Sequence, residues 1–75
     1  MQKLDVKKLR ESLGLTQVEF ARRYKLPLST VRKWEQKDRQ PQGPAESYLL
    51  VIQRIPDAVS IALSHIASVE NSHEP

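Results

Sequence analysis

The chain has no cysteine, only two glycines and only four aromatic residues among its 75 residues. Without cysteine, neither disulfides nor thiolate metal sites can stabilise the fold, and a reducing compartment is expected. No apolar run approaches the roughly 20 residues of a membrane span, and the first residues lack the apolar stretch of a signal peptide. We therefore expect one small cytoplasmic domain, residues 1–75, stabilised by apolar burial.

Charge is distributed unevenly along the chain, although the net charge is only +3. Residues 1–40 hold eleven of the twelve Lys and Arg but five of the nine Asp and Glu. The remaining residues are net acidic, with Arg54 as their one Lys or Arg. Any surface that binds a polyanion is therefore expected in the first half of the chain.

The first half contains signals for two capped helices. Asp5 precedes apolar residues at helical spacing, and Gly14 is suited to the left-handed position that ends a helix. Thr16 and Glu19 have the spacing of a capping box for a second helix, which we expect to run to about Tyr24.

Prolines divide the rest of the chain into three further helices. Pro27 fits the first turn of a third helix ending near Gln36, where Ser29 and Thr30 are expected to satisfy free amides. After a charged, proline-containing loop, Pro44 and Pro56 begin two more helices. No alternating strand pattern is present, so the sequence predicts an all-α domain of five short helices.

The second and third helices form a helix-turn-helix, at about residues 17–36. The small Ala21 lies where the two helices would cross, and Val31 and Trp34 are expected to pack inward. The opposite face of the third helix carries residue types that recognise base edges in the major groove. The predicted base-reading residues are Leu28, Ser29, Arg32, Lys33 and Gln36. The predicted phosphate contacts are Gln17, Arg22, Arg23, Lys37, Arg39 and Gln40.

The last two helices, about residues 44–69, carry more apolar residues than one side of a short helix can bury. Pairing with a second copy would cover these residues. It would also place the third helices of the two copies, which carry the base-reading residues, ~34 Å apart, as a pseudo-palindromic operator requires. The predicted dimerisation residues are Ile52, Ile55, Val59, Ile61, Ala62, Leu63 and Ile66.

The run LRESLGLTQVEFARRYKLPLSTVRKWEQ resembles the xenobiotic-response-element family of Cro and phage repressors. The resemblance implies a lambda-repressor-like helix-turn-helix DNA-binding domain. The longer combination of this run with its proline turn, the loop before Ala45 and the aliphatic helix ending in proline is similar to the HigA-type antitoxin branch. That implies a dimeric repressor of its own operon, partnered with a RelE- or HigB-like ribonuclease toxin. Where such families usually have glycine, this chain has Lys25 and Lys37, and left-handed geometry at each would cost about 1 kcal/mol.

Other kinds of site are not favoured by the sequence. Glu35 is expected to pair with Arg10 or Arg22, or to bond a backbone amide, rather than act in catalysis. His65 and His73 match no common metal-ligand spacing, and no phosphate-binding glycine loop or catalytic triad is present. We therefore expect neither an enzyme nor a bound cofactor or metal. Two alternatives to the antitoxin remain: a standalone regulator without a toxin, and an adaptor that uses the same fold to bind a polypeptide.

Overall fold

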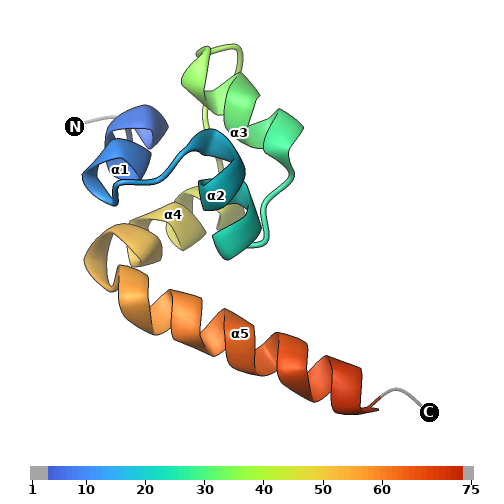
Figure 1. Cartoon of the computed structure of the whole chain (residues 1–75). Coiled ribbons are helices and arrows are strands. Elements are labelled where there is room, and N and C mark those ends of the chain that lie inside the picture. The colour runs from blue at the N-terminus through green and yellow to red at the C-terminus, as the bar shows by residue number, and fades with distance from the viewer. Residues whose placement is uncertain (1–3, 74–75) are drawn as a thin grey trace.

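The computed structural model describes the backbone of residues 4–73 and the side chains of residues 4–65. Within these residues the chain forms five helices and no strand, which confirms the predicted all-α fold (Figure 1). The helices are α1 (Val6–Ser12), α2 (Gln17–Arg23), α3 (Leu28–Glu35), α4 (Pro44–Arg54) and α5 (Pro56–His73).

The first two helices begin at the caps that the sequence predicts. The Asp5 carboxylate accepts a hydrogen bond from the Lys8 amide at 3.0 Å, which lowers the pKa of Asp5. Thr16 and Glu19 form the reciprocal capping box, with N–O distances of 2.9 and 3.1 Å. Both caps connect groups three residues apart, so they need no support from the rest of the fold.

The first three helices end in the same backbone motif. One residue in left-handed geometry follows each helix: Gly14 (φ 72°), Lys25 (φ 59°) and Lys37 (φ 66°). After α2, the Leu26 amide donates to the Ala21 carbonyl at 2.8 Å, and the equivalent bonds follow α1 and α3. This is the Schellman arrangement, which satisfies carbonyls that a helix end leaves free. The two lysines therefore adopt the geometry that glycine takes most readily.

Helix α3 begins differently from the prediction. Pro27 precedes the helix with extended backbone, and no side chain caps it. The expected capping by Ser29 and Thr30 is wrong, because both residues already lie inside the helix, whereas a capping side chain projects from the residue before it. The Pro27 carbonyl instead accepts hydrogen bonds from the Thr30 and Val31 amides, both at 3.1 Å.

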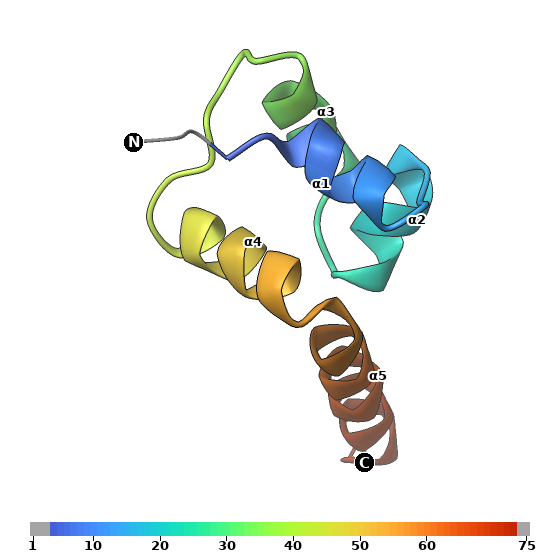
Figure 2. The same ribbon diagram turned by 90° about the vertical axis from the view of Figure 1, so that its left-hand side faces the viewer.

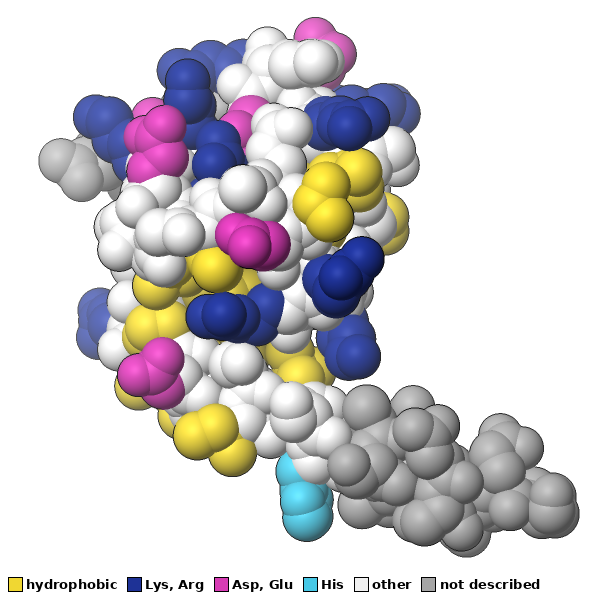
Figure 3. All heavy atoms as spheres, in the orientation of Figure 1, with side chains coloured by type: hydrophobic (Ala, Val, Ile, Leu, Met, Phe, Trp, Pro, Cys, Tyr) yellow, Lys and Arg dark blue, Asp and Glu magenta, His cyan; other side chains and the backbone are white. Residues whose placement is uncertain are grey.

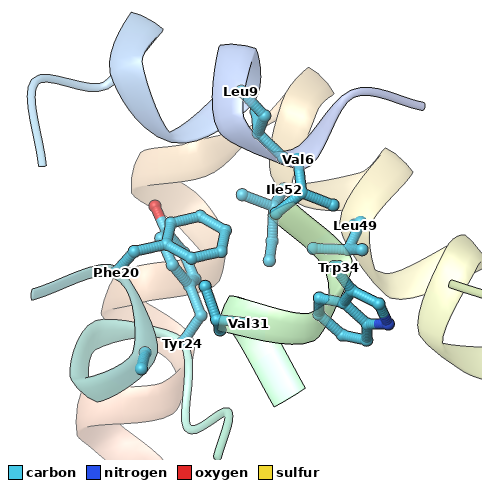
Figure 4. Close-up of a cluster of buried hydrophobic side chains, with 9 residues drawn as sticks. Val6, Leu9, Phe20, Tyr24, Val31, Trp34, Leu49 and Ile52 are labelled. Atoms are coloured by element: carbon cyan, nitrogen blue, oxygen red, sulfur yellow. The ribbon is translucent and has the colours of Figure 1, made fainter. Parts of the chain in front are cut away.

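A single hydrophobic core lies among α1, α2, α3 and α4 (Figure 4). Phe20 of α2 and Tyr24, the cap residue that follows the helix, are fully buried, with ring centroids 5.3 Å apart in a tilted arrangement. The core residues are Val6, Leu9, Phe20, Ala21, Tyr24, Val31, Trp34, Leu49 and Ile52. Because Val31 and Trp34 of α3 pack into this core, the core fixes the orientation of the helix.

Two tyrosines connect the N-terminal helices to α4 and α5. The Tyr48 hydroxyl donates to the Tyr24 carbonyl at 2.6 Å, and the Tyr24 hydroxyl donates to the Pro56 carbonyl at 3.1 Å. Beyond Pro56, α5 extends away from the other helices, as both ribbon views show (Figures 1 and 2). Among the residues of α5 whose side chains are described, Val59 and Leu63 pack on the body.

Candidate nucleic-acid interface

Helix α3 has two chemically distinct faces. Val31 is fully buried and Trp34 is 9% exposed, as expected for core residues. The other face is polar and open to solvent, and four of the five predicted base-reading residues lie there: Ser29, Arg32, Lys33 and Gln36. The fifth, Leu28, is half-buried and packs against the core, so only part of its side chain is available to a ligand.

Helix α2 holds α3 in place. Ala21 is 5% exposed, and the two helices pack directly on each other. A larger side chain at this position would separate them, so the small residue permits the close approach that the sequence predicts. The left-handed Lys25 reverses the chain between the helices, and Pro27 starts α3.

An ion pair joins the end of α3 to α1. Arg10 donates from Nε and Nη2 to the two carboxylate oxygens of Glu35, at 2.7 and 2.9 Å. The pair is largely buried, with side-chain exposures of 13% for Arg10 and 5% for Glu35. Hydrogen bonds from Arg10, aided by Gln17, hold the pKa of Glu35 below its ordinary value, although burial acts in the opposite direction. Of the partners considered from sequence, the structure selects Arg10.

Gln17 adds a hydrogen bond to the carboxylate of this ion pair. Its Nε2 donates to Glu35 Oε1 at 3.1 Å, and its side chain is half-buried. A side-chain amide has two N–H groups, so one is used internally and one is left for the predicted phosphate contact. No sequence signal points to the internal bond, because it joins residues that are 18 positions apart.

Three of the predicted phosphate-contacting residues follow α3. Lys37, Arg39 and Gln40 are all exposed. Lys37 and Gln40 line one hollow of about 190 Å³, together with residues at the start of α1. Because Lys37 directly follows the α3 cap residue, this group lies at the end of the helix whose polar face carries the base-reading candidates.

Arg22 and Arg23 lie elsewhere. They line a hollow of about 350 Å³ with Lys25 and with two residues of α5, Ser60 and Ser64. No residue of α3 lines this hollow. The structure therefore separates these two arginines from the phosphate candidates that follow α3, although the sequence pattern groups them together.

The predicted dimerisation surface needs one correction. Ile52 is fully buried in the core, so it cannot contact a second copy. Val59 and Leu63 are half-buried against the core, whereas Ile55, Ile61 and Ala62 are exposed. The side chain of Ile66 lies outside the described residues.

Two exposed apolar residues of α4 are absent from the predicted surface: Leu50 and Val51, at 44% and 45% exposure. They line a shallow hollow of about 290 Å³ with Ile55, and we call these three residues the α4 patch. A signal for them is present in the sequence. Residues 49–52 form an unbroken apolar run, and a helix that buries one face cannot bury four consecutive residues.

Neither a membrane-spanning helix nor a cluster of metal-ligand residues is found in the described part of the chain. No helix there is long and apolar enough to cross a membrane. No group of three or more His, Cys, Asp or Glu is placed to hold a metal ion among the same residues.

Comparison with known proteins identifies the family. The helix-turn-helix family profile matches residues 6–44. The structure is also similar to the crystal structure of an XRE-family-like helix-turn-helix protein from Agrobacterium tumefaciens, with 45% sequence identity and a TM-score of 0.76. The similarity covers 77% of this chain and 94% of that one. A search among curated proteins gives no match. On this sequence and structural similarity, the chain belongs to the XRE family of helix-turn-helix DNA-binding regulators.

Proposed function

We propose that this chain is a transcriptional repressor that reads a pseudo-palindromic operator as a homodimer. The observation that carries the proposal is the division of α3 into a buried apolar face and an exposed polar face. The buried face orients the helix, and the exposed face offers donors and acceptors suited to base edges. The similarity to the A. tumefaciens XRE-family-like protein supports the DNA-binding part of this proposal.

Each predicted base-reading residue has a chemical role in this proposal. Arg32 and Lys33 donate to guanine, and Gln36 forms paired hydrogen bonds with adenine. The exposed part of Leu28 contacts a thymine methyl group, and Ser29 bonds to either kind of base.

A second group of residues holds the DNA backbone. Lys37, Arg39, Gln40 and the free N–H of Gln17 contact phosphates on either side of the groove. These contacts position the protein without reading sequence, because every nucleotide presents the same phosphate.

Dimer formation through α4 and α5 is part of the proposal. The α4 patch is exposed, and Ile61 of α5 is 69% exposed. Large aliphatic side chains gathered on one face commonly mark a protein interface. A symmetric pairing uses the same surface of both copies, so the same exposed residues would be covered in each copy.

We further propose that the repressor is the antitoxin of a type II toxin-antitoxin pair. Support comes from the resemblance to the HigA-type branch, carried by the loop before Ala45 and the aliphatic helix that follows. The test is whether a RelE-like ribonuclease encoded beside this gene co-purifies with the chain and loses activity in the complex. A standalone regulator would have no such neighbour.

The test of the repressor is fluorescence anisotropy with DNA from upstream of the gene, beside an unrelated duplex of equal length. Both are titrated at several salt concentrations, and the mass of the protein is measured in the same buffer. A repressor binds the upstream DNA at least ~1,000-fold more tightly, as specific sites usually require, with two protomers per site. Its affinity falls steeply with salt, because phosphate binding releases counterions.

The contrary result would be equally informative. Equal, weak binding to both duplexes would rule out the repressor hypothesis and favour the adaptor hypothesis. An adaptor that binds a polypeptide through apolar contacts shows little dependence on salt.

A further inference from the structure

We propose that the hollow between α2 and α5 binds a small anion with two or more phosphate-type charges. This goes beyond the proposed DNA binding and uses a different surface. The hollow has a volume of about 350 Å³ and is lined by Glu19, Arg22, Arg23, Lys25, Ser60 and Ser64. We call it the α2–α5 hollow.

The fold brings these residues together from two helices. Arg22 and Arg23 occupy the last turn of α2, and Lys25 follows in the left-handed position that ends it. Ser60 and Ser64 lie four residues apart, so they lie on the same face of α5. In Figure 3, several Lys and Arg side chains lie along the lower part of the body, above α5, and others lie at the opposite end of the body.

Within the described side chains, the positive charge of the hollow is not balanced by ion pairs. Among residues 4–65, no carboxylate forms an ion pair with Arg22, Arg23 or Lys25. Glu19 is the one acidic residue in the lining, and its Oε1 accepts the Thr16 amide in the α2 capping box. Three cations therefore face one carboxylate that is already hydrogen-bonded, which leaves the site net positive.

The lining defines the class of ligand. Small-molecule sites of about 300–1,000 Å³ are usually lined by apolar and aromatic side chains, whereas every residue lining this hollow is polar. Guanidinium groups bind phosphate oxygens through paired hydrogen bonds, and serine hydroxyls supply further donors. The hollow is an open depression whose lining residues are exposed, apart from the half-buried Ser60. Since one water molecule takes about 30 Å³ of liquid, its volume of about 350 Å³ can still take more than one phosphate group. A compact oligophosphate fits this chemistry better than an aromatic ligand.

A free anion fits the hollow better than the DNA backbone does. The base-reading candidates are on α3, and neither α3 nor residues 37–40 contribute to the lining. The α5 serines, by contrast, form one side of it. A ligand held here would lie next to Lys25, three positions before the first residue of α3.

The experiment uses the intact chain and tripolyphosphate as the probe, at constant ionic strength. Binding is measured by calorimetry, and its location is mapped from amide chemical shifts. We expect shifts in residues 22–25 and 60–64, with residues 29–36 unchanged. Arg22→Gln should weaken tripolyphosphate binding about tenfold, because it removes a charged hydrogen-bond donor. The matched variant Arg39→Gln removes the same charge elsewhere and should change the affinity less than about twofold.

Three results would overturn the proposal. The first is no saturable binding of tripolyphosphate at millimolar concentration. The second is equal weakening by Arg22→Gln and Arg39→Gln, which would indicate general attraction to a basic protein. The third comes from a parallel titration with operator DNA. If Arg22→Gln lowers DNA affinity as much as Arg39→Gln does, Arg22 contacts the DNA backbone. A failure of operator binding in the wild-type chain would affect the proposed function and leave the tripolyphosphate result intact.

Discussion

The guanidinium of Arg10 binds both carboxylate oxygens of Glu35, at 2.7 and 2.9 Å, and so ties α1 to the last residue of α3. The same guanidinium donates to the Leu15 carbonyl at 2.9 Å, and Gln17 adds a third donor to the carboxylate. One ion pair therefore connects α1, the link before α2, α2 itself and α3. Since α3 carries the base-reading candidates, this pair fixes the end of the proposed DNA-reading surface.

Glu35→Gln should lower the free energy of unfolding by about 3 kcal/mol, because it leaves the largely buried Arg10 without a compensating charge. The folded-state pKa of Glu35 lies below its ordinary value of 4.5. The carboxylate therefore stabilises the fold fully above that value, and this stabilisation is lost as the pH falls through the lower folded-state pKa. Urea denaturation at pH 7 and at pH 3 should show a smaller difference between wild type and variant at pH 3.

The control for that prediction is the double variant Arg10→Met, Glu35→Leu, which removes both charges. It should cost less than the two single variants added together, because neither charge is left unpaired. Strict additivity would show that the two side chains do not interact.

Lys25→Gly should stabilise the fold by about 0.5–1 kcal/mol, because glycine adopts the left-handed geometry of this residue without strain. Lys25→Ala removes the same charge but keeps the strain, so it should give no gain. Thermal denaturation of the two variants separates the backbone effect from the loss of charge.

Lys37→Gly should give a similar gain in stability for the same reason. Unlike Lys25→Gly, it should also weaken DNA binding, because Lys37 is a proposed phosphate contact. An unchanged DNA affinity, measured by anisotropy, would show that Lys37 is not part of the DNA interface.

Tyr48→Phe should destabilise the fold by about 1 kcal/mol, because the Tyr24 carbonyl loses a hydrogen bond of 2.6 Å. Burial raises the pKa of Tyr48 above its ordinary value of 10.0. The phenol therefore stabilises the fold fully below that value, and the contribution is lost as the pH rises through the higher folded-state pKa. The variant should show a weaker loss of stability at alkaline pH than the wild type.

Arg32→Ala and Lys33→Ala should each cost about 1–3 kcal/mol of operator affinity and relax preference at one base position. Arg39→Ala should weaken binding to all sequences alike and reduce the salt dependence, since it is a proposed phosphate contact. Binding to a library of single-base operator variants distinguishes the two behaviours. Uniform losses for all three variants would refute the assignment of the base-reading residues.

Ile61→Ser should shift the protein from dimer to monomer at micromolar concentration without lowering the stability of the monomer, because this side chain is 69% exposed. Val18→Ser is the matched control, since Val18 is an exposed aliphatic residue of α2, outside the proposed dimer surface. Sedimentation analysis of both variants checks the prediction. Equal behaviour of the two would move the dimer interface away from α5.

The local structure of the first half was predictable from sequence because its signals act over a few residues. Asp5 and Thr16 cap helices by bonding amides three positions ahead, and Gly14 ends α1 through its own backbone geometry. The inward position of Val31 and Trp34 follows from helical spacing alone. The helix-turn-helix and the polar face of α3 could therefore be predicted from the order of the residues.

Side-chain relationships between distant residues could not be predicted in the same way. The apolar spacing of α4 places Ile52 among the dimerisation residues, whereas the packing of α4 on the core buries Ile52 and leaves Leu50 and Val51 outside. Which residues of an apolar run face inward depends on the direction from which other helices approach, and helical spacing does not contain that information.

The sequence by itself determined where most of the helices begin and end and which face of α3 is polar, since caps, left-handed residues and apolar spacing act within a few residues. The tertiary structure alone decided which partners meet. It selected Arg10 for Glu35, and it placed Arg22 and Arg23 beside α5 rather than with the phosphate candidates after α3. The physical reason is that these contacts depend on the rotation and crossing of whole helices, which the packing of the entire core sets at once.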